Sequence, residues 1–392
     1  MPIFYDAPIV PDTLTTYIRA QPLPTGNQLS ALFPEEFKPE NMVDFMEVVK
    51  KTRTASYRSF DGRIHVSARD RGTQKRVPLA PLSDSLGQGE YERLQLEFAK
   101  LGGTAKIQLE NALYNDAENL TSYIRNRVEL AWGDVLADGK LTIAEGGLNS
   151  EADYGIPDDH KVTAATLWTD VEKSDPINDL MAWSDIWTKD NGDAPGHILT
   201  SLKITRALQR NKSLIAAITG STIGKTFVSL DEINTFLSSN GLPILLPHYD
   251  TLLDVEGTDT RVLPDNLAIL LPTDKRELGY MAWGMTATAL ELMQAGQTEY
   301  TFADAPGIVG VVIKEGPPFR QYTFVDAVGQ PILENPYKII IGTVGDAASN
   351  VDTKPKAEPA SAPEPKETNS EAASDTAKRP GRPAKTSDAA GN

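Results

Sequence analysis

Four short segments contain residues whose types and spacing could do chemistry, and the first is a glycine-rich loop. Residues Gly220–Thr226 read Gly-Ser-Thr-Ile-Gly-Lys-Thr, which resembles the phosphate-binding loop of nucleotide-dependent enzymes. That loop has four residues between its glycines, whereas three separate Gly220 from Gly224. It also joins a strand to a helix, but here the pattern predicts a helix first and a strand-like segment second. We interpret the segment as a turn, with phosphate binding by Lys225 and Thr226 as the alternative.

The second segment has the acid spacing of a calcium-binding loop. Asp134, Asp138 and Glu145 would occupy its first, fifth and twelfth positions, with Gly139 at the sixth. The third position is Leu136, which has no oxygen ligand, and the residues after the segment cannot form the exiting helix. A turn from a helix to a strand explains the same residues and is the interpretation we favour.

The third segment is the cluster Asp158-Asp159-His160 on a proline-flanked loop, and it could bind a metal ion. We favour an exposed polar loop, because none of the four histidines has a partner at the spacing that places two ligands on one helix face. The chain has no cysteine and no nucleophile elbow of the G-x-S-x-G kind. We therefore expect no catalytic residue, no cofactor and no metal, and we expect that the protein is not an enzyme.

The fourth segment lies near the end of the chain, where Lys378–Pro383 contains Arg379-Pro380-Gly381-Arg382. It resembles an AT-hook, whose arginines enter the narrow minor groove of A·T-rich DNA. Pro380 replaces the basic residue that precedes the glycine in that motif. The alternative is a flexible solubilising tail. The candidate DNA contacts are Lys378, Arg379, Arg382 and Lys385.

Composition and charge limit the function further. The chain has 392 residues, of which 40% are hydrophobic, so most of it should fold. Its beginning lacks the pattern of a signal peptide, and no apolar run approaches the roughly 20 residues of a membrane span, so we expect a soluble, non-secreted protein without membrane contact. The formal charge is −16, all of it before Asn350, which disfavours nucleic-acid binding by the body.

One basic segment runs against this acidic background. Between positions 53 and 76, only Asp61 and Asp70 oppose seven basic residues. Such a segment could dock on a neighbouring copy of the same chain, although a solvated charged hairpin explains the charge equally well. The candidate contact residues are Arg53, Arg58, Arg63, Arg69, Arg71, Lys75 and Arg76.

The first half of the chain predicts an arm, a hairpin and a long helix. Seven prolines in the first 50 residues favour an extended arm. Arg53–Leu82 alternates and contains an Asp61-Gly62 turn, which predicts a protruding β-loop. Apolar residues at intervals of four and three predict a helix over Leu109–Val135.

The rest of the chain predicts a mixed α+β body. Gly307–Val344 should form three strands, separated by turns at Gly316–Pro318 and Asp326–Pro331. Beyond Asp346 the composition predicts disorder. The middle segments are predicted as a strand at Lys140–Ala144; a helical region at Thr163–Trp187 with packed Trp168, Trp183 and Trp187; helices at Leu199–Ile218, Asp231–Asn240 and Gly279–Ala295; and strands at Ile244–Leu246 and Leu267–Leu271 around the acidic loop Asp250–Asp259.

Short motifs along the chain, together with the order of its elements, point to one family. The motifs are Tyr17-Ile18-Arg19, Leu32-Phe33-Pro34, Asp153-Tyr154-Gly155, His160 before Trp168, Asp179-Leu180 with Trp183, Gly279 to Gly284, Asp326, Gly329, Pro331 and Asn335-Pro336. In these motifs and in its order of elements, the chain resembles the lambda-type major capsid protein E family of tailed phages. The resemblance covers most of residues 1–345 and implies the Hong Kong 97-type capsid fold.

The resemblance implies a structural protein that assembles as pentamers and hexamers into an icosahedral head enclosing double-stranded DNA. It implies scaffold, portal and decoration partners, assembly in the host cytoplasm, and a place in the virion capsid. An encapsulin-like shell of the same fold is the nearest alternative, and a nucleotide-binding enzyme using Gly220–Thr226 is the other. The implied layout is an N-terminal arm at 1–52, an extended β-loop at 53–85, a peripheral domain at 86–198 with its spine helix at 109–135, an axial domain at 199–306, closing strands at 307–345 and a disordered tail at 346–392.

Overall fold

The computed structural model describes residues 11–47, 73–89, 105–145, 147–220, 224–255, 257–294, 307–315 and 320–346. All of these belong to a single compact unit. The predicted tail at 346–392 lies outside the described residues except for Asp346. No helix in the described part of the chain has both the length and the apolar character needed to cross a membrane.

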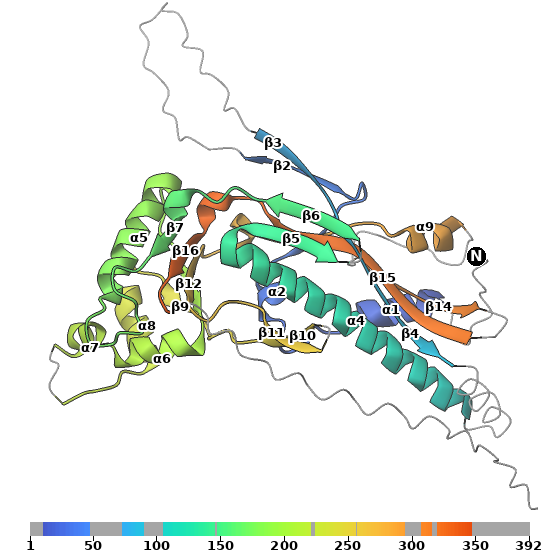
Figure 1. The fold of residues 1–392 in the computed structure, drawn as a ribbon, viewed down its shortest axis with the longest axis horizontal. Helices are drawn as coiled ribbons and strands as arrows, with labels where there is room; N and C mark the ends of the chain where they lie inside the picture. Colours follow the sequence, from blue (N-terminus) through green and yellow to red (C-terminus); the bar gives the residue numbers. More distant parts are fainter. Residues whose placement is uncertain are drawn as a thin grey trace, which may run out of the picture. The chain divides into compact units, whose positions relative to one another are not determined.

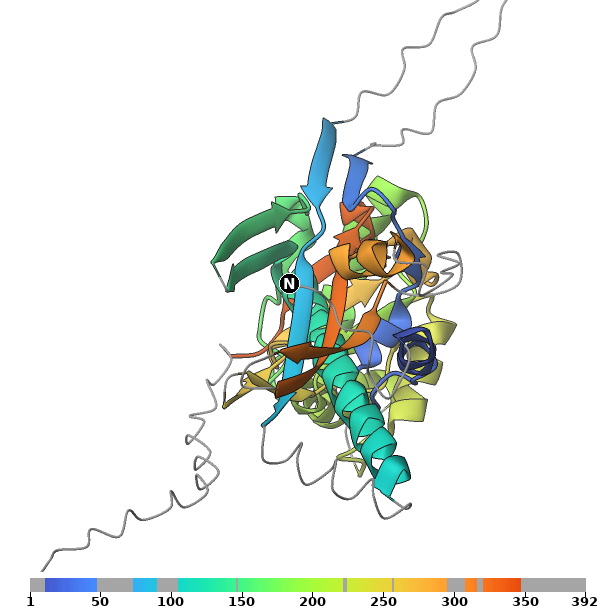
Figure 2. The same ribbon diagram turned by 90° about the vertical axis from the view of Figure 1, so that its right-hand side faces the viewer.

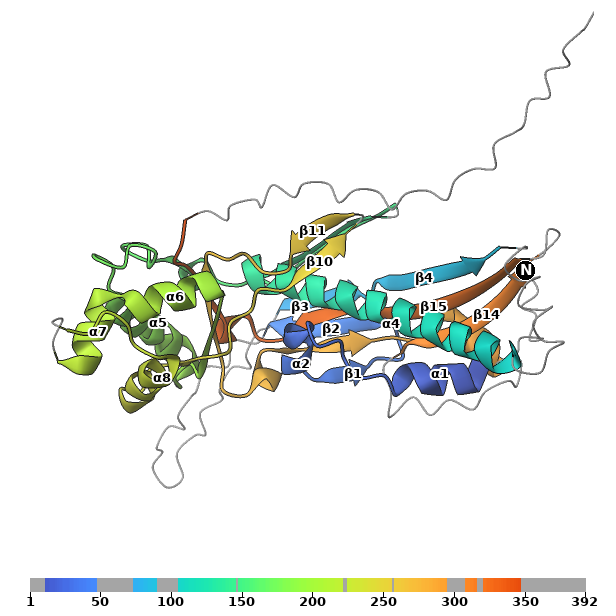
Figure 3. The ribbon, with the colours of Figure 1, turned by 90° about the horizontal axis from the view of Figure 1, so that it is seen from below.

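A long helix, α4 (Ala105–Asp138), runs beside two strands of the longer sheet (Figures 1 and 3). It contains the predicted helical range 109–135 and is about 51 Å long at 1.5 Å per residue. The apolar residues at the predicted spacing are buried, from Leu113 to Val135. The helix ends at Gly139, whose φ of 82° suits glycine, and the chain turns directly into a hairpin. Its strands are β5 (Lys140–Glu145) and β6 (Leu148–Asp153).

The longer sheet lies against α4 and has the order β1-β13-β15-β14, with β4 paired to the other side of β15. The central strand β15 covers 14 residues and exchanges hydrogen bonds with three other strands. The strands are β1 (Glu35–Phe37), β4 (Pro81–Gln88), β13 (Gly279–Trp283), β14 (Val309–Glu315) and β15 (Arg320–Leu333).

The predicted turn at Asp326–Pro331 is wrong, because this segment lies inside β15. It marks a change of partner: Val328 is the last residue paired with β4, and Gly329 is the first paired with β13. A Cβ on Gly329 would lie 2.7 Å from the carbonyl oxygen of Ala282. Glycine therefore serves the close approach of two strands here and does not reverse the chain.

The second sheet has the order β7-β16-β12-β8-β9. The three predicted closing strands therefore do not form one sheet, because β14 and β15 belong to the longer sheet and β16 to this one. The strands of this second sheet are β7 (Lys161–Thr163), β8 (His197–Thr200), β9 (Ile244–Leu245), β12 (Leu267–Leu271) and β16 (Ile340–Thr343).

Four helices pack with the second sheet around a separate core (Figure 1). We call these helices and the second sheet together the helical unit. The predicted packing of Trp168, Trp183 and Trp187 is confirmed, since all three are buried there. The predicted range Thr163–Trp187 is helical only from Pro176 onward. The helices are α5 (Pro176–Asn191), α6 (Leu202–Arg210), α7 (Lys212–Thr219) and α8 (Leu230–Ser239).

The predicted single helix at Leu199–Ile218 is wrong, since a strand and two helices occupy it. Asn211 separates the helices. Its fully buried side chain accepts a hydrogen bond from Leu214 N and donates two to Ser174. An asparagine that caps the second helix and binds a distant loop competes with helix continuation.

Two other predicted segments also have a different structure. Gly279–Ala295 forms β13 and then the short helix α9 (Ala287–Gln294), because burial of every β13 residue favours a central strand. The acidic loop Asp250–Asp259 contains a hairpin. Its strands are β10 (Leu252–Val255) and β11 (Thr258–Arg261). Among the described residues, the three-residue helices are η1 (Asp158–His160), η2 (Lys275–Glu277) and η3 (Pro336–Lys338).

The N-terminal segment packs on the longer sheet and on α4. Helix α1 (Pro11–Arg19) lies on β14, and Phe33 stacks on Trp132 of α4 with the ring centroids 3.9 Å apart. The proline-rich arm is therefore well packed over these residues. The arm also contains α2 (Gln28–Leu32) and β2 (Met42–Glu47), and β2 pairs with β3 (Thr73–Pro78), which lies outside the arm.

Candidate assembly surface

Strands β2 and β3 form a two-stranded ribbon that extends away from the two sheets (Figure 2). Met42 pairs with Pro78 at its base, and Glu47 pairs with Thr73 at its open end. The predicted β-loop at 53–85 is thus divided: residues 53–72 lie outside the described part, β3 belongs to the ribbon, and β4 belongs to the longer sheet.

The predicted contact residues cluster around this ribbon in sequence. Lys75 stands opposite Phe45 in the register, and Arg76, which is exposed, stands opposite Asp44. The other candidates for this contact, Arg53, Arg58, Arg63, Arg69 and Arg71, lie outside the described residues. The same holds for the tail candidates Lys378, Arg379, Arg382 and Lys385.

Asn41 fixes the base of the ribbon to the body. Its side-chain amide donates to the carbonyl oxygen of Met285 (2.7 Å), and its side-chain oxygen accepts from Met285 N (2.6 Å). Its backbone carbonyl accepts from Leu79 N (3.0 Å). Asn41 has a φ of 51°, a left-handed conformation that asparagine tolerates better than most residues. One side chain therefore sets the direction in which the ribbon leaves.

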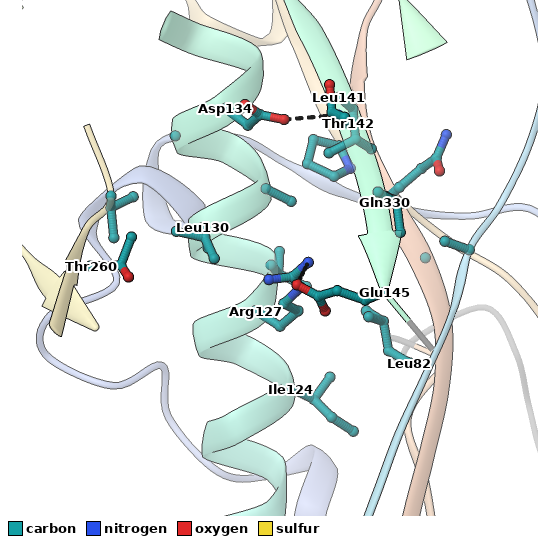
Figure 4. A pocket seen from close by; sticks show the side chains of 18 of the residues that line it. Leu82, Ile124, Arg127, Leu130, Asp134, Leu141, Thr142, Glu145, Thr260 and Gln330 are labelled. Carbon is teal, nitrogen blue, oxygen red and sulfur yellow. Dashed lines mark hydrogen bonds and ion pairs between the residues drawn. The ribbon is translucent and has the colours of Figure 1, made fainter. Parts of the chain in front are cut away.

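A groove of about 910 Å³ lies between α4, the β5–β6 hairpin and the start of β4 (Figure 4). Its wall is mainly apolar, with Leu82, Ile124, Leu130 and Leu141 among the lining residues. Half-exposed Tyr123 also lines it. A polypeptide segment from another chain could occupy such a groove, whereas nothing in the lining resembles a catalytic constellation.

The acidic residues that have the spacing of a calcium-binding loop stabilise the turn beside this groove. Asp134 accepts a hydrogen bond from Thr142 N (2.8 Å; Figure 4), and Asp138 accepts one from Lys140 N (2.8 Å). Burial raises the pKa of Asp134. Glu145 forms an ion pair with Arg127 (2.9 Å). The predicted turn from a helix to a strand is confirmed.

Two charged residues of α4 hold the N-terminal segment, and the sequence analysis did not identify them. Arg125 contacts Glu35 at 3.4 Å. Glu129, which is fully buried, accepts hydrogen bonds from the backbone amides of Leu29 and Ser30 (both 2.8 Å) and from the Ser30 hydroxyl (2.6 Å). In sequence this pair has the spacing of an ordinary surface ion pair on a helix. Nothing local in the sequence reveals that each member binds the arm instead.

The glycine-rich segment forms a helix end. Helix α7 stops at Thr219, and Gly220 caps it in the left-handed conformation with a φ of 70°. Lys225 forms an ion pair with Glu232 (2.6 Å) near the start of α8. The hydrogen bond from Lys225 is the main cause that lowers the pKa of Glu232 to about 2. The helix that precedes the segment is confirmed, but the strand-like segment predicted at 227–230 forms no strand: residues 225–229 have no regular structure, and α8 begins at Leu230.

His160 differs from its prediction as part of an exposed loop, since its side chain is fully buried. Nδ1 lies 2.7 Å from the carbonyl oxygen of Ile339, and Nε2 lies 3.1 Å from Asp190. An oxygen of Asp159 lies within 4.8 Å of these groups, so the three side chains could approach a metal ion. The two contacts of the ring nitrogens already account for the burial of His160, because they tie η1 to α5 and to the segment before β16.

Comparison with known proteins agrees with this architecture. No curated protein sequence matches the chain. A proposed prophage capsid protein of Escherichia coli CFT073 is 15% identical with a TM-score of 0.56, and the match covers 86% of this chain and 99% of that one. A phage-related protein of Bordetella bronchiseptica RB50 is 13% identical with a TM-score of 0.52, over 88% and 100% of the chains. The holo-SrpI encapsulin complex of Synechococcus elongatus PCC 7942 is 10% identical with a TM-score of 0.42, over 83% and 92%.

The sequence itself matches a family described as phage major capsid protein E. The match extends over residues 11–299, which is more than half of the chain. It includes α1, α4, the four helices of the helical unit and β13. The protein is therefore a structural capsid protein of the Hong Kong 97-type fold, and the chain belongs to the phage major capsid protein E family.

Proposed function

We propose that the chain assembles as pentamers and hexamers into an icosahedral phage head that encloses double-stranded DNA. The observation that carries this proposal is the ribbon of β2 and β3, in a member of a capsid family. Among the described residues its two strands pair only with each other. An isolated two-stranded ribbon is at best marginally stable in water. A neighbouring copy would cover it in an assembled shell.

We propose that the basic residues near the ribbon contact the acidic body of that neighbour. Such a contact joins two different surfaces of identical chains, which is the type of interface that generates rings. Opposite charges would guide the encounter and fix its register. The proposed contact residues are Arg53, Arg58, Arg63, Arg69, Arg71, Lys75 and Arg76.

Electron microscopy with light scattering on the chain expressed alone tests the assembly. Closed shells or five- and six-fold rings are expected. A chain that stays monomeric, even when the other head proteins of its phage are coexpressed, would overturn the proposal. The coexpression arm matters because scaffold, portal and decoration proteins are proposed partners.

A charge variant tests the ribbon contact without disturbing β3. Replacing the arginines at 53, 58, 63, 69 and 71 by glutamine should leave a folded subunit and abolish shells. The matched control replaces the tail residues Lys378, Arg379, Arg382 and Lys385 by glutamine, which should leave assembly intact. Normal shells from the first variant would refute the contact.

We propose that α4 is the spine helix of a peripheral domain spanning 86–198 and completed by 307–345, with an axial domain at 199–306. The helical unit supports the axial assignment, since much of its core comes from the start of that range. Strand β13 belongs to the longer sheet, however, so the range 199–306 contributes to both cores. Labelling positions in α7 or α8 for distance measurements should give short distances between copies in a ring.

We propose that the tail contacts packaged DNA through Lys378, Arg379, Arg382 and Lys385, in heads assembled in the host cytoplasm. The support is the AT-hook-like sequence and the neutral charge of the tail on an acidic body. Chains lacking residues 350–392 should bind A·T-rich DNA more weakly than the full chain, with a smaller dependence on salt. Equal binding by both chains would refute it.

We propose no enzymatic role, and two alternatives each have a direct test. An encapsulin-like shell would copurify with an enzyme cargo and would lack DNA. A nucleotide-binding enzyme would be stabilised by ATP, because a ligand that binds the native state raises its melting temperature. The ion pair of Lys225 with Glu232 favours the structural role of that loop.

A further inference from the structure

Three consecutive residues between β9 and β10 each bind a different part of the molecule. Tyr249 reaches α4, Asp250 reaches the first turn of α6, and Thr251 reaches the segment just before α2. Two of these parts belong to the longer-sheet core and one to the helical unit. We call Tyr249–Thr251 together with Glu129 the junction.

On the side of the arm, the junction depends on a buried carboxylate. Tyr249 donates its hydroxyl to Glu129 at 2.8 Å, next to the three donors from Leu29 and Ser30. Thr251 donates to the carbonyl oxygen of Gly26 at 2.9 Å. The first turn of α2 and the residues before it are thus held from two directions.

Within the folded protein, the carboxylate of Glu129 depends mainly on the arm for its hydrogen bonds. It is fully buried, and among the described residues no cationic side chain forms an ion pair with it. A buried charge without a counter-ion is costly unless hydrogen bonds replace its hydration. Three of its four donors come from the arm, so undocking of α2 would leave only the Tyr249 hydroxyl.

On the side of the helical unit, two of the three residues, Tyr249 and Asp250, hold the end of β8 and the start of α6. Asp250 accepts from Leu202 N at 2.8 Å, where a carboxylate is favoured by the exposed amides of a helix start, and it also pairs with Arg261 at 2.7 Å. Tyr249 N donates to the carbonyl oxygen of Thr200 at 3.0 Å. Docking of the arm at Tyr249 and capping of α6 at Asp250 therefore involve adjacent residues of one short segment.

We propose that the junction couples docking of the arm segment 26–30 on α4 to the stability of the start of α6. In this proposal the arm segment has two states, docked and undocked. Undocking weakens the hydrogen bonds of Glu129 and, through Tyr249 and Asp250, the contact with the start of α6. The coupling is reciprocal by thermodynamic necessity, so loosening either side loosens the other. The proposal concerns a single folded chain and is independent of its assembly.

Hydrogen exchange measured by mass spectrometry on the full-length, unassembled chain tests this coupling. Ser30→Ala removes one donor to Glu129 and should speed exchange in a peptide covering 27–32 by about tenfold, the usual effect of losing a hydrogen bond to a charged group. It should also speed exchange severalfold in a peptide covering 200–206. In a Tyr249→Phe background, the second response should disappear.

Controls and a second variant make the outcome decisive. Tyr154→Phe also removes a buried tyrosine hydroxyl, which donates to Pro331 O, but away from the junction, and should leave the response of 200–206 to Ser30→Ala unchanged. Thr251→Val removes the hydrogen bond to the carbonyl oxygen of Gly26, together with the contact of the same hydroxyl with Tyr249, and replaces Ser30→Ala if that variant fails to fold. A change confined to 27–32 would overturn the proposal. A response of 200–206 that persists with Tyr249→Phe would overturn it as well.

Discussion

The two cores of the protein differ in how far apart in sequence their residues lie. The longer-sheet core combines residues from Leu14 to Ile341, so the arm, α4 and the last strands must all be in place. The core of the helical unit draws mostly on residues 164–245, with contributions from β12 and β16. Local contacts form at a lower entropic cost than distant ones. We infer that the helical unit tolerates disturbance of the arm better than the longer sheet does.

The cores also differ in chemistry. Charged Arg125 and Glu129 are buried beside the longer-sheet core, where both bind the arm. In the helical unit, Trp183 stacks on Trp168, whose indole N–H donates to Asp179 eleven residues further along the chain. An apolar core with local contacts is robust, whereas buried charges make the other core conditional on a distant segment.

The largest expected effect comes from removing the aromatic contact between the arm and α4. Phe33→Ala deletes the stack on Trp132 and should cost about 3–5 kcal/mol, the usual range for a buried phenylalanine. Urea denaturation should show earlier unfolding of the longer-sheet core, with a smaller effect on the helical unit. Leu208→Ala in α6 is the control and should have the reverse effect. Equal loss of both cores would contradict the comparison.

A smaller effect is expected from overpacking the helical unit. A Cβ on Gly342 would lie 2.6 Å from the Trp183 ring and 3.1 Å from the carbonyl oxygen of Ala268. Gly342→Ala should therefore cost about 1–3 kcal/mol, because the ring must move. Gly89→Ala, where a Cβ meets nothing within 4 Å, should change the free energy of unfolding by less than about 0.5 kcal/mol. Thermal unfolding compares the two variants.

The ribbon anchor should give a local effect. Asn41→Ala removes both side-chain hydrogen bonds to Met285 and places alanine at a φ of 51°, for a cost of about 1–2 kcal/mol. Hydrogen exchange at Met285 should become faster while the helical unit stays unchanged. Asn41→Gly removes the same hydrogen bonds, but glycine adopts a positive φ without strain. Its stability should therefore lie between that of the unchanged chain and that of Asn41→Ala. If alanine and glycine behaved alike, the conformation of Asn41 would contribute nothing.

The smallest effect concerns the loop between α7 and α8. Lys225→Met should raise the pKa of Glu232 from about 2 toward its ordinary value, because the lysine is the main cause of the lowering. A carboxyl group whose pKa is lower in the folded than in the unfolded state stabilises the folded state at pH values above the unfolded-state pKa. In the unchanged chain, this contribution of Glu232 to stability is therefore lost as the pH falls from about 4 to 2. NMR titration of Glu232 in both chains measures the shift. An unchanged pKa would show that Lys225 is not its cause.

Periodic patterns predicted the elements that depend on local sequence. The apolar spacing of α4 and the three packed tryptophans follow from side-chain types alone. Segments whose structure depends on a distant partner were missed. Gly279–Trp283 has residues that suit a buried helix or a buried strand, and pairing with β15 decides between them.

The assembly surface could be predicted only in outline. The family resemblance and the basic segment pointed to contacts between copies, but Asn41 and Glu129 gave no local signal. An asparagine after a proline-rich stretch reads as an ordinary turn residue. A glutamate four residues after an arginine reads as half of an exposed pair, and only the fold reveals that both bind the arm.

The unbroken strand β15 has a mechanical consequence. Its 14 residues span about 46 Å, and along that length it exchanges β14 and β4 for β13 without reversing direction. A pull on one end is carried through covalent bonds to the other, so it loads the hydrogen bonds of both halves together in shear. The strand therefore transmits tension along its length, and under force the chain would unfold first in the segments packed around it.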